Sequence, residues 1–136
     1  MKRFLSLLAC ILITSAACTK AHSTKSEDTP NENISVRENV IYKLFPTQNM
    51  WTFIKLNTRN GKMWQVQYSV KGEEYRFETD LNRMPLISEK EESNGRFMLY
   101  PTQNTYNFIL LDQLDGRTWQ VQWSMEAENR GIMPIE

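Results

Sequence analysis

The fold is decided by two copies of one motif: residues 42–70 read YKLFPTQNMWTFIKLNTRNGKMWQVQYSV, and residues 97–125 read FMLYPTQNTYNFILLDQLDGRTWQVQWSM. The offset is 55 without a gap over 29 aligned positions, and 14 of these positions are identical. A match of this length indicates an internal duplication. The two copies are therefore expected to share a fold and to pack against each other.

In each copy, three runs of strand-forming residues are separated by turn signals. The Asn-Gly at residues 60–61 and the Asp-Gly at residues 115–116 are strong signals for tight hairpins. In the first copy, residues 74–79 alternate between aromatic and charged and predict a fourth strand. Each copy is therefore expected to form an antiparallel meander of three to four strands. The three shared runs are expected at residues 42–45, 51–57 and 63–70 and at residues 97–100, 106–112 and 118–125.

The third run of each copy alternates, with Trp and Val on one face and Gln on the other. We expect Trp64 and Trp119 to be the central core residues, and Gln65 and Gln120 to face solvent or, alternatively, a partner's main chain. Two meanders with one apolar face each can bury those faces against each other. This predicts an all-β pseudo-twofold sandwich or flattened barrel. A propeller usually needs at least four sheets, so two copies are too few for one in a single chain.

The N-terminal residues predict export from a bacterial cell. Two cations at positions 2 and 3 precede an apolar run over 4–13 and small residues up to Cys18, which is the order of a secretory signal. The sequence Ser-Ala-Ala-Cys over 15–18 is similar to a lipobox. We therefore expect a signal peptide over 1–17, acylation of Cys18 and anchoring in the outer membrane. The sequence allows either the periplasmic face or the surface face of that membrane. The alternative is an ordinary secreted protein cut before Cys18.

The remaining chain divides into a tether and one domain. Residues 18–35 are polar and nearly free of apolar side chains, which predicts a flexible tether. Residues 36–136 form a single predicted β domain, with its repeats over 36–87 and 94–136. The chain has 16 basic and 16 acidic residues, and loss of the two cations in the signal leaves 14 against 16, a net charge of −2. This balance argues against nucleic acid as a partner.

The composition of the domain argues against catalysis and against metal or cofactor binding. The one histidine is His22, in the predicted tether, and the cysteines are Cys10 and Cys18. Nucleophilic triads need a base beside Ser or Cys, and the domain supplies neither His nor Cys. No Asp or Glu pair recurs in both copies, and Asp115 is explained by its turn. We therefore expect a protein that is not an enzyme.

The aromatic residues that follow the Pro-Thr-Gln-Asn loops are the best candidates for a binding surface. They could form a stacking platform for sugar rings or for a peptide. The amides of the loop could touch a ligand, or their identity in both copies could reflect turn geometry alone. The candidate binding residues are Trp51, Tyr106, Gln48, Asn49, Gln103 and Asn104.

The repeated unit PTQN…GxxWQVQ(Y/W)S, which ends at Ser69 in the first copy and at Ser124 in the second, resembles a group of small bacterial lipoproteins of unassigned role. The resemblance implies localisation and fold, and it implies no activity. We expect a lipid-anchored envelope module that binds a protein of the envelope or a secreted effector. Three alternatives are a periplasmic immunity protein that neutralises a toxin, a carbohydrate-binding accessory lipoprotein, and a structural subunit that docks by its sheet edges.

Overall fold

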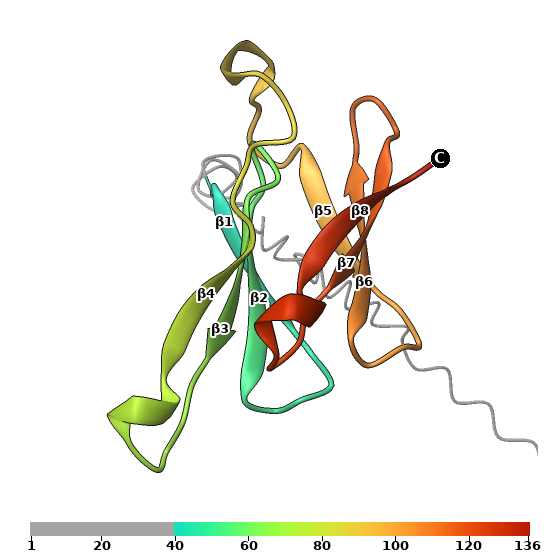
Figure 1. Ribbon diagram of the computed structural model, residues 1–136. Coiled ribbons are helices and arrows are strands. Elements are labelled where there is room, and N and C mark those ends of the chain that lie inside the picture. Colours follow the sequence, from blue (N-terminus) through green and yellow to red (C-terminus); the bar gives the residue numbers. More distant parts are fainter. Residues whose placement is uncertain (1–39) are drawn as a thin grey trace, which may run out of the picture.

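The computed structural model describes residues 40–136 as an all-β protein (Figure 1). The predicted signal peptide, Cys18 and the predicted tether lie outside the described residues. The chain forms two four-stranded antiparallel sheets, each with its strands in sequence order. The first sheet contains β1 (Tyr42–Pro46), β2 (Thr52–Asn57), β3 (Met63–Gln67) and β4 (Phe77–Asn82). The second sheet contains β5 (Phe97–Pro101), β6 (Asn107–Asp112), β7 (Thr118–Gln122) and β8 (Gly131–Ile135).

These two sheets confirm the predicted pair of meanders, with differences at the strand ends. β3 and β7 end three residues earlier than expected, and β4 begins at Phe77 because residues Glu73–Tyr75 form the short 3-10 helix η1. The second copy has a matching fourth strand, β8, after the 3-10 helix η3 (Ala127–Asn129). β8 tolerates Pro134 because it is an edge strand that pairs only with β7.

The tight turns form where the sequence predicted them. Gly61 and Gly116 have φ angles of 77° and 80°, which glycine adopts at little cost. A longer connection joins the two sheets and contains the 3-10 helix η2 (Glu89–Glu91). Glu92 in this connection accepts a hydrogen bond from Asn60 Nδ2 at 2.9 Å, so the connection is fixed to the first hairpin.

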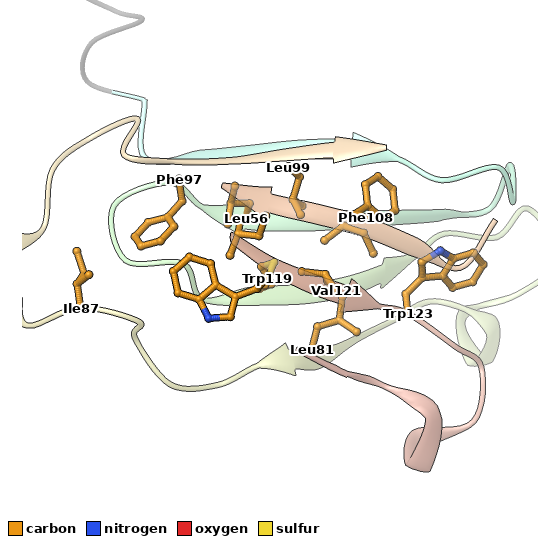
Figure 2. Packing of buried hydrophobic residues seen from close by; sticks show 12 residues of the cluster. Leu56, Leu81, Ile87, Phe97, Leu99, Phe108, Trp119, Val121 and Trp123 are labelled. Atoms are coloured by element: carbon orange, nitrogen blue, oxygen red, sulfur yellow. The ribbon is translucent and has the colours of Figure 1, made fainter. Parts of the chain in front are cut away.

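The core lies between the two sheets, as expected for a sandwich, and the sheets do not close into a barrel (Figure 2). The first sheet contributes Ile54, Leu56, Met63 and Leu81, and the second contributes Phe97, Leu99, Phe108, Leu110, Trp119, Val121 and Trp123. Ile87 joins them from the connection. Phe97 and Trp119 pack with ring centroids 6.1 Å apart. The prediction for Trp119 is confirmed.

The two sheets bury opposite faces, whereas the alternating pattern predicted that equivalent faces would be buried. We call the face that carries Trp64 and Trp119 the front face of each repeat, and the face that carries Gln65 and Gln120 the back face. Repeat two buries its front face, so Trp119 is only 7% exposed, whereas Trp64 is partly exposed. Repeat one buries its back face, and Gln65 is fully buried. The predictions that Trp64 is a core residue and that Gln65 faces solvent or a partner are therefore wrong.

The burial pattern also corrects the predicted symmetry. A twofold axis between the sheets would bury equivalent faces of both repeats, and here the back of one packs on the front of the other. The strand order agrees, because β4 packs near its equivalent β8 and β2 packs near β5. Repeat two is thus related to repeat one by a displacement that keeps face and edge order, and not by a local twofold.

Candidate functional site

The Pro-Thr-Gln-Asn loops owe their shared sequence to turn geometry. In repeat one, Asn49 Oδ1 accepts the backbone N–H of Trp51 at 2.9 Å, and Thr47 Oγ1 lies 2.9 Å from the carbonyl oxygen of Thr52. In repeat two, Asn104 Oδ1 accepts the N–H of Tyr106 at 2.9 Å. Each asparagine side chain therefore holds the aromatic residue that follows it in place.

The two loops lie at the same end of the molecule, the lower end in Figure 1. The hydroxyl of Thr105 donates to Gln48 Oε1 at 3.0 Å and connects the loops directly. Gln103, the equivalent of Gln48, is exposed. Neither glutamine lines the aromatic cleft of its repeat, so the structure separates these two candidates from the aromatic ones.

In repeat one, Trp51 lies in a shallow cleft of about 280 Å³ between the start of β2, the end of β3 and η1. The rings of Trp51 and Tyr68 pack with centroids 5.2 Å apart and planes tilted by 56°, and both rings remain exposed. The lining residues are Trp51, Gln67, Tyr68, Ser69, Val70, Lys71 and Tyr75.

Repeat two has a cleft at the equivalent place, with a volume of about 410 Å³. Tyr106 is 53% exposed and packs on Trp123, with centroids 5.2 Å apart and planes tilted by 46°. Six residues that line this cleft lie 55 positions after residues that line the first cleft, and so are their equivalents in the repeat. The lining residues are Asn104, Tyr106, Asn107, Gln122, Trp123, Ser124, Met125, Glu126 and Asn129.

A glutamine amide is fixed in the same way in both clefts. Gln67 Nε2 donates to the carbonyl oxygen of Tyr75 at 3.3 Å, and Gln122 Nε2 donates to that of Asn129 at 2.9 Å. These bonds join the end of the third strand to the 3-10 helix that borders the cleft. Each cleft therefore combines a held aromatic pair with an oriented amide and a serine, at Ser69 or Ser124.

The second aromatic of each pair differs between the clefts. Trp123 is buried, and its indole N–H donates to the carbonyl oxygen of Thr105 at 2.9 Å. Its equivalent Tyr68 is exposed, because the front face of repeat one is uncovered. The cleft of repeat one consequently offers three exposed rings, Trp51, Tyr68 and Tyr75, and that of repeat two offers Tyr106.

Two acidic residues of repeat two, Asp112 and Asp115, are engaged by arginines. Arg96 is 7% exposed and donates to both carboxylate oxygens of the fully buried Asp112, at 2.8 and 2.9 Å. Arg117 donates to Asp115, which lowers the pKa of Asp115 to about 2. The hydrogen bond from Arg96 to Asp112 likewise raises the pKa of Arg96. This cluster joins β6, β7 and the start of β5 and has a structural explanation.

Trp51, Tyr106 and Asn104 are the predicted candidates that the structure places in the clefts. Sequence reasoning missed the roles of Tyr68 and Trp123, which it assigned to the alternating pattern of a strand. A usable signal was present, because the Gln-aromatic-Ser segment recurs at residues 67–69 and 122–124 beside the recurring loop. The repeated loop and the repeated strand end meet in space and line one cleft in each repeat.

Two further observations concern residues 40–136 alone. No helix in this part of the chain is long and apolar enough to cross a membrane. No group of three or more Asp, Glu, His or Cys side chains in this part could hold a metal ion. The sequence matches no protein-family model, and no similar curated protein or solved structure was found.

Proposed function

We propose that this protein is a lipid-anchored carbohydrate-binding protein of the bacterial envelope, with one sugar site in each repeat. The observation that carries the proposal is the recurrence of the same aromatic and amide cleft at equivalent positions of both sheets. A cleft kept in two copies that differ in half of their residues supports a shared ligand.

The chemistry of the cleft suits a sugar. The apolar C–H face of a pyranose ring packs on the electron-rich face of Trp51 or Tyr106, and its hydroxyl groups bond to amides and hydroxyls. Gln122, Asn104 and Ser124 supply such groups in repeat two. Each lining includes one charged side chain, Lys71 or Glu126, so neither cleft favours a strongly charged ligand.

The dimensions and number of the clefts agree with binding to part of a longer glycan. Ligand sites typically have volumes of about 300–1,000 Å³. The two clefts, at about 280 and 410 Å³, lie near the lower end of this range. Shallow single sites bind weakly, and two sites on one chain raise the overall affinity for a repeating ligand by about 10²–10⁴. Acylation of Cys18 would concentrate such sites on a membrane.

Binding is tested by screening the full chain, carrying Cys18→Ala so that it is not acylated, on a glycan array. The strongest glycan is then titrated by isothermal calorimetry. Two sites per chain are expected, and Trp51→Ala and Tyr106→Ala should each remove one site. Leu114→Ala, an exposed residue in the β6–β7 turn, is the control and should keep both sites. An array without any binding, or a glycan that binds both cleft variants at full stoichiometry, would overturn the proposal.

The lipid anchor is tested separately by fractionating cells that express the full chain or Cys18→Ala. The full chain should be in the membrane fraction and label with a palmitate analogue, because a multiply acylated cysteine anchors stably. Cys18→Ala should lose the label and the membrane association. Retention of both by the variant would contradict acylation at this residue and would leave the sugar sites untouched.

The protein-binding hypothesis stays a prediction. The feature that favours it is the uncovered front face of repeat one, which carries several exposed apolar side chains. That face lies on the opposite side of the first sheet from the core.

A further inference from the structure

The packing of the two repeats leaves one face of each sheet uncovered. Inside the chain, the back of repeat one packs on the front of repeat two. The front of repeat one and the back of repeat two therefore face outward, on opposite sides of the molecule. One outer face is therefore a front face and the other a back face, and a front face and a back face also pack together between the two sheets.

The outer front face of repeat one is apolar at positions that are buried in repeat two. Tyr42 is 53% exposed and its equivalent Phe97 is fully buried; Leu44 is 60% exposed and its equivalent Leu99 is 2% exposed. Phe53, Trp64 and Val66 are partly exposed, and their equivalents form the centre of the core. The front face of repeat one has thus kept the residues that a covering sheet would contact.

The outer back face of repeat two shows the same relation to repeat one. Ile109 and Leu111 are partly exposed, and their equivalents Ile54 and Leu56 are fully buried between the sheets. Other apolar side chains extend this face along its edge strands. They are Met98, Tyr100, Met133 and Ile135.

We propose that copies of this chain associate head to tail, with the front of repeat one of each copy packing on the back of repeat two of the next. The occupant is a second copy because the chain already contains this interface between its own repeats, built from equivalent positions. Apolar faces on both sides of a domain of this size also indicate an interaction surface.

The same geometry predicts how the assembly ends. An interface between two different faces is heterologous and closes into a ring when the rotation between neighbours divides a full turn. Four-stranded antiparallel sheets repeated around an axis form propellers of typically about four to eight sheets. With two sheets per chain, two to four chains complete such a ring. Two sheets are too few for a propeller in one chain, whereas several chains together supply enough sheets.

Lys55 and Glu78 place charged side chains on the outer front face of repeat one, where the inner front face of repeat two is apolar. Lys55 forms a salt bridge with Glu78 and lies 4.6 Å from the ring centroid of Trp64. In the register of the sheets, these positions correspond to Leu110, which is in the core, and to Ile132, which is partly buried against it. Burying an ion pair costs more than burying apolar side chains of similar size. The contact between chains should therefore be weaker than the internal one and reversible on dilution.

The first experiment measures mass against concentration for the full chain with Cys18→Ala, by sedimentation velocity. We expect a reversible step from one chain to a single species of two to four chains. The double variant Lys55→Leu, Glu78→Ile, which copies the residues of repeat two, should shift this step to lower concentration by about fivefold or more. A monomer at every concentration in both proteins would overturn the proposal. An assembly whose mass keeps rising with concentration would contradict closure into a ring and would still support the contact between front and back faces.

A mixing experiment tests the head-to-tail arrangement. Leu44→Glu blocks the front face and Ile109→Glu blocks the back face, at positions already exposed or partly exposed. Each variant alone should be monomeric with an unchanged circular dichroism spectrum, and an equimolar mixture should form a dimer and nothing larger. The matched control Leu114→Glu should assemble like the parent. Dimers formed by either variant alone would show that like faces pair, and would overturn the head-to-tail contact.

Discussion

The two repeats differ most where their sequences agree best. Both have Trp-Gln-Val-Gln in the third strand, yet repeat two buries the Trp and Val of this motif and repeat one buries its first Gln. Alternation along a strand defines two faces, and it does not say which face a neighbouring sheet will cover. Burial at a given position is therefore a property of the stack of sheets and not of the repeat.

The repeats have adapted to their different surroundings at a few positions. Lys55 and Glu78 pair on the outer front face, at the places that Leu110 and Ile132 occupy on the inner front face. On the outer back face, Gln120 Nε2 donates to Asn107 Oδ1 at 2.8 Å. The equivalent Gln65 is buried, and its Oε1 has no hydrogen-bond partner within the described residues.

The largest expected difference between the repeats comes from their equivalent tryptophans. Trp119→Ala should lower the free energy of unfolding by about 3–5 kcal/mol, because it leaves a cavity in the core. Trp64→Ala should cost no more than about 1–2 kcal/mol, because this ring is partly exposed and its contacts are Tyr42 and Lys55. Urea unfolding of both variants measures the difference. Equal losses would contradict the opposite burial of the two front faces.

The equivalent glutamines should respond differently to the same substitution. Gln65→Met should raise the free energy of unfolding by about 1 kcal/mol, because it replaces a buried carbonyl oxygen that lacks a partner with an apolar group of similar length. Gln120→Met should leave stability unchanged or lower it by up to about 1 kcal/mol, since it removes the bond to Asn107. Thermal unfolding of the pair measures the sign, and a destabilised Gln65→Met would show that this buried amide is satisfied.

The smallest expected difference is in the dependence on pH. Arg117 donates to Asp115 and lowers its pKa to about 2 in the folded protein, below the ordinary value of 3.8. A lowered pKa stabilises the fold above about pH 4, and this contribution is lost as pH falls towards 2. Repeat one has Asn60 at the equivalent position, which does not titrate.

Asp115→Asn should therefore flatten the acid limb of the stability curve between about pH 4 and pH 2. The matched change in the other repeat, Asn60→Asp, removes the amide that donates to Glu92 and places a second carboxylate beside it, so it should lower stability at neutral pH and not add an acid limb like that of Asp115. Urea unfolding at several pH values compares these variants with the parent. An acid limb that is unchanged in Asp115→Asn would assign the pH dependence to other carboxylates.

Much of the architecture was predictable because the duplication supplies each local signal twice. The hairpin glycines, the strand-ending prolines and the Asn of each loop act over a few residues, and their physical effect does not depend on the partner sheet. The aromatic residues of the clefts were found for the same reason. Their partners Tyr68 and Trp123 were not, because a strand end and a loop meet only after the sheet has formed.

The sequence by itself determined an all-β chain of two equivalent meanders, because strand period, turn chemistry and the internal repeat are local or pairwise properties of the residues. Only the tertiary structure decided that the back of repeat one covers the front of repeat two. Each sheet has apolar side chains on both faces, so the alternating pattern allows either face to be buried. The choice depends on how the whole sheets stack, and it is this choice that leaves two complementary faces open.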